Sequence, residues 1–106
     1  MFEFIETPFF TKVLQRYLSD DEYCELQQFL NEHPESGAVV PGSGGVRKLR
    51  WSLKGRGKRG GLCLIYYVRR AVGEIWMITI YGKNIRGNIP AHVLKQMKEA
   101  LGKWAK

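Results

Sequence analysis

Apolar residues recur at helical spacing through two stretches in the first third of the chain. The first stretch follows Thr7, whose hydroxyl can cap a helix, and Pro8, which suits the first helical position. The second follows Ser19, which forms a capping box with Glu22, and it ends before Pro34, because the residue before a proline disfavours helical geometry. The pattern predicts two helices that together form a hairpin of about 25 residues.

Strand patterns lie on both sides of this helical hairpin. Residues 2–6 alternate between apolar and acidic side chains, which is typical of a short strand. A loop rich in Gly, Pro and Ser is expected at 35–45, and three further strands follow it. These three strands span 46–53, 62–69 and 74–81. Residues 70–73 are few enough to join the last two strands as a hairpin, whereas 54–61 are expected to form a flexible basic loop.

The last part of the chain has a helical pattern again. From about Ile89 or Pro90 to Lys103, apolar side chains mark one helix face and lysines mark the other. The predicted order is therefore β-α-α-β-β-β-α. This order is typical of a small α+β domain in which helices cover an antiparallel meander, and we expect the first strand to join the same sheet.

The alternation along two of the strands assigns side chains to the two faces of the sheet. On 46–53, Lys48 and Arg50 share one face, and Leu49 and Trp51 share the opposite, core-facing one. On 74–81, we expect the even and the odd residues to face opposite sides. The even set is Trp76, Ile78 and Ile80, and the odd set is Met77, Thr79 and Tyr81. The sheet is thus expected to be buried on one side and semi-polar on the other.

The size and composition are those of one globular domain over residues 1–106. With 44% hydrophobic residues, the chain has enough apolar surface to form a core rather than remain disordered. Its apolar runs are shorter than the roughly 20 residues of a membrane-spanning helix, and its acidic N-terminus is unlike a secretory signal. We therefore expect a cytoplasmic protein. Two cysteines and two isolated histidines have no metal-ligand spacing, so we expect neither metal nor cofactor.

The charge is distributed unevenly along the chain. Lys and Arg number 17 and Asp and Glu 10, which gives a net charge of +7. Between Ser36 and Gly73 there are nine basic residues and no acid, which leaves a net charge of −2 for the rest of the chain. Such segregation predicts a polyanionic partner, nucleic acid first and an acidic protein second.

Four short motifs within and after this basic segment occur in a specific order and spacing. They are GGVRKLR at 44–50, KGRGKRGG at 54–61, LIYY at 64–67 and TIYGKN at 79–84. Together they resemble the RelE/HigB family of toxins from bacterial type II toxin–antitoxin systems, in particular its HigB-like branch. The resemblance covers essentially the whole chain.

The resemblance implies both a fold and a function. It implies a RelE-like, microbial-ribonuclease-like α+β fold and a toxin that inhibits translation as a metal-independent mRNA endoribonuclease. Toxins of this family usually cut the mRNA in the A site of the ribosome, on the 30S subunit. It also implies a cognate antitoxin, often a helix-turn-helix DNA-binding protein, that neutralises the toxin.

Metal-free RNA cleavage needs a base for the ribose 2′-OH, a cationic clamp for the phosphate charge and an acid for the leaving oxygen. The basic segment contains no His or Glu, so Lys, Arg and Tyr would have to serve. In the family, the strand at 46–53 presents cations to the scissile phosphate, which makes Lys48 and Arg50 the candidates for clamp and base. The resemblance also places Tyr81 and Lys83 beside the cleavage site. There Tyr81 could stack on a base or donate a proton, and Lys83 could neutralise the phosphate.

The glycine-rich basic loop is a candidate RNA-binding segment. Its backbone N–H groups can approach phosphates, and its cations can follow an RNA strand. The predicted RNA-binding residues are Arg47, Lys54, Arg56, Lys58 and Arg59.

Two positions depart from the family pattern. Many relatives have an arginine clamp where this chain has Cys63, and more distant relatives have another arginine at Asn84. Loss of the first arginine would remove roughly 2–4 kcal/mol of transition-state stabilisation. Three explanations are open: a weakened toxin, a toxin altered so that its expression is tolerated, or a toxin that uses Arg50 or Arg59 instead. Cys63 itself lies in an apolar strand and is predicted to be a packed thiol.

The remaining reactive residues are assigned structural roles. Cys24 is expected to be buried in the helical hairpin, and Tyr66 and Tyr67 point to opposite faces of their strand. His33 at a helix end and His92 in the first turn of the last helix lack a positioned partner that would support catalysis.

Two other functions stay open. The first is a ParE-like toxin that poisons DNA gyrase, and the second is a basic RNA-binding module with weak or no catalysis. Lys48, Arg50 and the Tyr-Gly-Lys motif at 81–83 favour the endoribonuclease, since ParE-like chains generally lack this set of cations.

Overall fold

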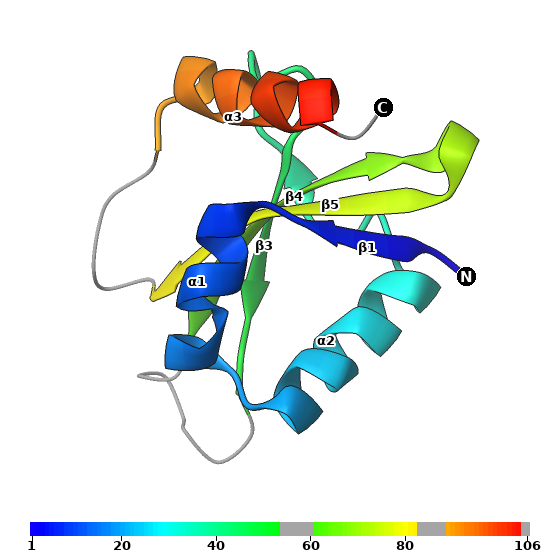
Figure 1. The fold of residues 1–106 in the computed structure, drawn as a ribbon, viewed down its shortest axis with the longest axis vertical. Coiled ribbons are helices and arrows are strands. Elements are labelled where there is room, and N and C mark those ends of the chain that lie inside the picture. The colour runs from blue at the N-terminus through cyan, green and yellow to red at the C-terminus, as the bar shows by residue number, and fades with distance from the viewer. Residues whose placement is uncertain (54–60, 83–88, 105–106) are drawn as a thin grey trace.

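A computed structural model of the chain describes residues 1–53, 61–82 and 89–104, and in these ranges it contains three α-helices and one five-stranded sheet (Figure 1). The elements in chain order are β1 (Glu3–Glu6), α1 (Pro8–Tyr17), α2 (Asp20–Glu32), β2 (Ala38–Val39), β3 (Arg47–Trp51), β4 (Leu62–Arg69), a 3₁₀ turn (Arg70–Val72), β5 (Glu74–Gly82) and α3 (Ala91–Trp104). In the described ranges, no helix is long and apolar enough to cross a membrane.

The strands form a mixed sheet in the order β1-β5-β4-β3-β2. β1 pairs with β5 in parallel, and the other neighbours are antiparallel, so β3, β4 and β5 form the predicted meander. The α+β class and the place of the first strand in the sheet are confirmed. β2 lies in the stretch predicted to be a loop, where Ala38 pairs with Lys48 and Val39 with Arg47.

The helices begin where the predicted caps lie. Thr7 accepts a hydrogen bond from the Phe10 N–H at 2.9 Å, and Pro8 occupies the first helical position of α1. Ser19 and Glu22 form both hydrogen bonds of the capping box at the start of α2. Local side-chain chemistry therefore fixes the start of each helix. Cys24 is exposed on α2, so the expectation of a buried thiol there is wrong.

Helices cover both faces of the sheet. α1 and α2 lie on one side, here called the α1/α2 face, and α3 lies on the other, the α3 face (Figure 1). Phe10 and Leu26 belong to the larger apolar cluster on the α1/α2 face, and Ile65 and Leu94 to a smaller one under α3. The expected semi-polar face is thus wrong wherever α3 packs on the sheet.

An irregularity between β4 and β5 changes which side chains face α3. Ile65 pairs with Thr79 but Tyr66 pairs with Met77, so Ile78 is an extra residue in β5. Such a β-bulge breaks the alternation of side chains. Ile78 and Tyr81 pack under α3, whereas Ile80 packs on the α1/α2 face. The predicted even and odd sets are therefore wrong beyond Ile78.

Candidate active-site cleft

A cleft of about 630 Å³ opens on the α3 face, where β3 meets the start of α3. Its lining includes residues 38–41, from β2 and the turn after it, and residues 89–91, at the start of α3. Ile65 and Leu94 are buried beneath it, and Lys48, Arg50 and Tyr81 complete its lining. The cleft thus combines residues from β2, β3, β4, β5 and α3.

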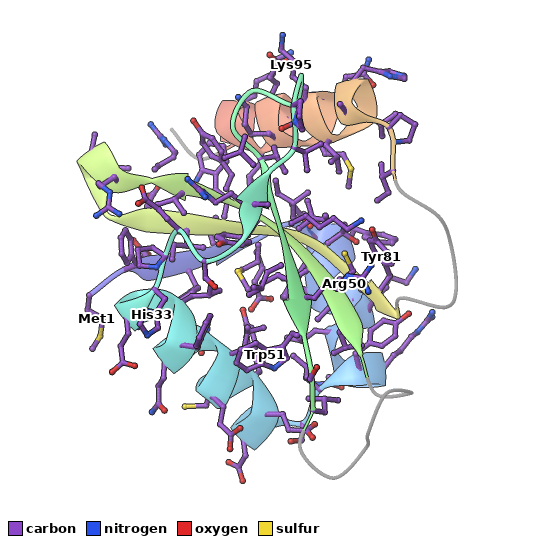
Figure 2. All side chains as sticks on the ribbon, turned by 180° about the vertical axis from the view of Figure 1, so that it is seen from behind. Met1, His33, Arg50, Trp51, Tyr81 and Lys95 are labelled. Atoms are coloured by element: carbon purple, nitrogen blue, oxygen red, sulfur yellow. The ribbon has the colours of Figure 1, made fainter. Side chains whose placement is uncertain are left out.

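The strand register explains why three of the predicted catalytic residues meet here. Arg50 pairs with Cys63 and Cys63 with Tyr81, so these three residues form one row across β3, β4 and β5. Lys48 lies two residues from Arg50 and pairs with Ile65 of the α3 face cluster. Figure 2 shows Arg50 and Tyr81 close together at this end of the sheet. Paired residues share a face of a sheet, and therefore Lys48, Arg50 and Tyr81 all belong to the cleft.

The opposite side of β3 points into the core, as the alternation predicts. Leu49 is buried on the α1/α2 face, and the Trp51 ring packs against Phe29 of α2 with ring centroids 5.1 Å apart. Figure 2 shows Trp51 directed toward α2. These apolar anchors hold β3 so that its two cations face the cleft.

The three polar residues differ in how far they reach into solvent. Arg50 is exposed and Lys48 is half-buried. Tyr81 is only 8% exposed, so only a small part of it can reach a ligand in the cleft. The lining that the structure describes contains two cations and neither an acid nor a histidine. Such a lining can hold an anion and stabilise negative charge that develops on it.

Arg47 does not belong to the cleft. Its guanidinium donates hydrogen bonds to the carbonyl oxygens of Glu35 at 3.2 Å and Gly37 at 2.7 Å. It pairs with Tyr66, whose side chain belongs to the α1/α2 face, so it points away from Lys48. The structure therefore places this predicted RNA-binding residue in the support of the chain just before β2.

Two other cations of the basic segment lie at the opposite end of β4. Arg69 forms an ion pair with Glu74 at 3.3 Å and stacks over the Trp76 ring, 4.9 Å from its centroid. Arg70 pairs with Glu35 at 3.3 Å. Among the described residues, these two cations at the end of the acid-free segment are thus paired with acids from outside it.

Several predicted site residues lie outside the described ranges. They are Lys54, Arg56, Lys58, Arg59 and Lys83. Cys63 is 2% exposed and belongs to the cluster under α3, so it is a packed thiol as predicted. His33 follows α2 and His92 lies in the first turn of α3, and both are exposed.

Tyr66 supports the segment before β2 that leads into the cleft. From the sequence, only a general structural role was predicted for it. Its hydroxyl accepts a hydrogen bond from the Gly37 N–H and donates one to the Pro34 carbonyl, both at 2.9 Å. Burial raises the pKa of Tyr66, which keeps the phenol protonated and able to donate. A Cβ on Gly37 would lie 2.9 Å from the Tyr66 ring, so only glycine fits there. These contacts place β2 beside β3.

Ser43 is a second support that sequence reasoning missed. This buried residue lies in a turn whose Gly42, Gly44 and Gly45 have φ between +77° and +97°. Its hydroxyl donates to the Val40 carbonyl at 2.6 Å and accepts from the Val46 N–H at 3.0 Å. The cluster of glycines around this serine could have predicted a tight turn, because left-handed backbone favours glycine.

No protein-family model matches the chain. Among the residues that the structure describes, no group of three or more His, Cys, Asp or Glu side chains could hold a metal ion. The resemblance to RelE/HigB toxins therefore rests on the four sequence motifs alone.

Proposed function

We propose that this protein is a RelE/HigB-like toxin that cleaves messenger RNA at the ribosome without a metal ion. The observation that supports the proposal is the convergence of Lys48, Arg50 and Tyr81 in one cleft whose described lining has no acid. These residues come from two motifs that lie some thirty positions apart in the sequence. RNA cleavage develops negative charge at a phosphate, and this cleft offers two cations and a phenol to meet it.

Each residue has a role that its chemistry allows. A guanidinium stays protonated in proteins, so Arg50 is the clamp for the phosphate oxygens. Lys48 is assigned as the base for the ribose 2′-OH, and the ammonium that forms when it takes that proton then joins the clamp on the phosphate. Tyr81 can donate its hydroxyl proton to the leaving oxygen. Lys83, outside the described residues, is proposed to neutralise the phosphate as well.

The proposed partners follow from this activity. The substrate is mRNA in the A site of the 30S subunit, and the protein acts in the cytoplasm. A cognate antitoxin, proposed to be a helix-turn-helix protein, would neutralise the toxin through an acidic or amphipathic segment. Such a complex forms faster at low salt, since opposite charges steer the two proteins together.

The experiment compares the protein with its Lys48→Ala/Arg50→Ala variant after brief induction in cells. Mapped mRNA 5′ ends should show new cuts with the unaltered protein, and the double variant should lose roughly 100-fold or more of this cleavage. The control is Lys12→Ala/Arg16→Ala, which removes two exposed cations from α1 and should leave cleavage unchanged.

Other outcomes would contradict the proposal. If no new mRNA ends appear while DNA supercoiling collapses, the protein is a gyrase poison of the ParE type. If it binds RNA without cutting it, the protein is a basic RNA-binding module. Cleavage that depends on a bound metal, tested by chelation at magnesium levels that keep ribosomes intact, would contradict the assigned chemistry.

A further inference from the structure

A groove separate from the cleft lies between the start of α1 and the second half of α3, and it is here called the α1/α3 groove. Its volume is about 320 Å³, and the residues that line it are Thr7, Pro8, Phe9, Met97, Ala100 and Leu101. The cleft is lined by residues at the start of α3, whereas this groove is lined by residues nearer its end. The two sites therefore lie toward opposite ends of the same helix.

The α1/α3 groove offers apolar contacts. Phe9 is 53% exposed, and Pro8 and Ala100 are exposed as well. Pro8 has no N–H, and the Thr7 hydroxyl already donates to the Ile78 carbonyl at 2.8 Å. An apolar groove rimmed by polar residues is typical of a surface that another molecule covers.

Cations flank the groove on both helices. On α1, Lys12 lies one turn after Pro8, and Arg16 lies one turn further along. On α3, Lys103 lies one turn after Ala100. All three cations are exposed. A partner that covers the apolar lining therefore meets positive charge on both sides.

The described acids nearby do not offset these cations. α1 contains no acid, and the one acid of α3 is Glu99. Glu99 is two positions from both Met97 and Leu101, and residues two apart on a helix do not share a face. Glu6 precedes Thr7, but its carboxylate accepts a hydrogen bond from the Tyr23 hydroxyl of α2 at 2.7 Å. Its charge is therefore directed toward α2.

We propose that the α1/α3 groove binds an acidic amphipathic helix of another protein. Apolar side chains of that helix, spaced at i, i+3 and i+4, enter the groove. Its acids meet Lys12, Arg16 and Lys103. The inference goes beyond the proposed function, because this binding requires neither RNA nor its cleavage.

Two other occupants fit the groove less well. An extended strand gains affinity from main-chain hydrogen bonds to a sheet edge, but most of this lining consists of side chains from two helices. A second copy of this chain would bring α1 or α3 against the same cations, and both helices have more basic than acidic residues. Like charges in contact weaken an interface. The acidic helix of this chain, α2, already packs its apolar side in the core.

Both sides of the groove are held in place before any partner binds. The Thr7 N–H donates to the Met77 carbonyl at 3.1 Å, which fixes the start of α1 to β5. On α3, Leu101 is 5% exposed, and a Cβ on Gly102 would lie 3.4 Å from the Trp76 ring. A preformed groove lowers the entropy cost of binding, because fewer groups must be ordered.

The experiment measures binding of a fluorescent synthetic peptide of about 18 residues, or five helical turns. Leucines at i, i+3, i+4 and i+7 form its apolar stripe, and glutamates and alanines fill the other positions. A second peptide has lysine in place of glutamate, and a third has the acidic composition in shuffled order, without the stripe. At low salt, the acidic peptide should bind at least roughly tenfold more tightly than either. Its advantage over the lysine peptide should shrink as salt rises.

A pair of matched variants locates the contact. Phe9→Ser/Ala100→Glu removes an exposed aromatic ring and adds an acid, and it should weaken binding of the acidic peptide roughly tenfold or more. Val72→Ser/Ala71→Glu makes the same kind of change at exposed residues of the 3₁₀ turn and should leave binding unchanged. Urea denaturation checks that both variants are folded, and Phe9→Ser alone replaces the double variant if that one is not.

A further variant tests the charges on the two sides of the groove. Lys12→Gln/Lys103→Gln should weaken binding of the acidic peptide roughly threefold and leave binding of the shuffled peptide unchanged. Equal weakening for both peptides would show general attraction to the basic protein and would overturn the groove as the site.

Other outcomes would also overturn the inference. Equal binding of the acidic and shuffled peptides would exclude an apolar stripe as the recognised feature, and tighter binding of the lysine peptide would exclude the charge match. An equal loss in Val72→Ser/Ala71→Glu would place the contact elsewhere. If the protein dimerises in sedimentation and Phe9→Ser abolishes the dimer, a second copy is the occupant. Cleavage of mRNA plays no part in these measurements, so the failure of either proposal leaves the other standing.

Discussion

The two faces of the sheet are built for different purposes. Among the described residues, thirteen buried side chains form the cluster on the α1/α2 face, and six form the one under α3. Two helices close the first face, whereas α3 leaves one end of the second open as the cleft. Burial of apolar area provides most of the stability of a fold. The α1/α2 face therefore provides most of the apolar burial, and the thinner α3 face leaves room for a ligand.

The α3 face itself contains two cationic regions with opposite surroundings. At one end, Arg69 contacts Glu74 and Trp76. At the other, Arg50 lies in the cleft, whose described lining has no acid. A cation that is already compensated gains little from binding a further anion. The same residue type is therefore structural at one end and suited to ligand binding at the other.

The largest effect is expected from a substitution that creates a cavity in the core on the α1/α2 face. Leu26 is fully buried there, so Leu26→Ala should lower the free energy of unfolding by about 2–5 kcal/mol. Urea denaturation measures this loss, and Gln28→Ala, at an exposed position of α2, should stay within about 0.5 kcal/mol of the unaltered protein. Cleavage per folded molecule should not change. A loss below about 1 kcal/mol would contradict the importance assigned to this face.

A smaller effect, on activity, is expected beneath the cleft. Cys63 lies between Arg50 and Tyr81 in the strand register, so an arginine there would point to the same face as both. Cys63→Arg should raise cleavage about tenfold, which corresponds to about 1.4 kcal/mol in the barrier. Because Cys63 is 2% exposed, the larger side chain should also lower stability by about 1–3 kcal/mol.

The control for this variant is Cys63→Met, which adds bulk to the same site without charge. It should show a loss of stability but no gain in cleavage of mRNA. If the arginine variant is folded and no more active than the methionine variant, position 63 is not a clamp position in this chain. The expectation from the family would then be wrong at this residue.

The smallest effect is expected where α3 holds the turn beside the cleft. Lys98 Nζ bonds to the Gly44 carbonyl and lies 4.8 Å from the centroid of the Tyr67 ring. Lys98→Met should lower the free energy of unfolding by about 0.5–1 kcal/mol, because this cation–π contact is partly exposed. Lys95→Met removes an exposed lysine of the same helix and is the matched control in denaturation. Equal stability of the two variants would show that Lys98 does not hold the turn.

Much of the fold could be predicted because its signals are local. Thr7 and Ser19 cap the helices through hydrogen bonds to residues three positions away. The β4 bounds match the predicted 62–69, since a continuous apolar run between turns needs no information from elsewhere. Lys48 and Arg50 share the cleft for the same reason, because alternation along one strand is a local property.

Most of the failed predictions depended on contacts between segments that lie apart in the sequence. The bulge at Ile78 follows from the pairing of β5 with β4, and the sequence of β5 alone does not predict it. β2 depends on Tyr66 and Arg47, which reach back about thirty and ten residues to hold the chain at Gly37. The segment that lacks acids in the sequence still has an acidic contact in space, because Arg70 pairs with Glu35, which lies far from it along the chain.

Sequence patterns alone predicted the three helices, the described strands other than β2, the shared face of Lys48 and Arg50, and the motifs that resemble a toxin family. These features depend on spacing and capping along a few neighbouring residues. The strand register was needed to show how Tyr81 comes to line the same cleft as the two cations, and the contacts in space were needed to show that Arg47 and Arg69 bond elsewhere and that apolar residues share the lining. The physical reason is that charge compensation and cavities arise from side chains brought together across the sheet. How close two side chains lie in space cannot be predicted from how far apart they are along the chain.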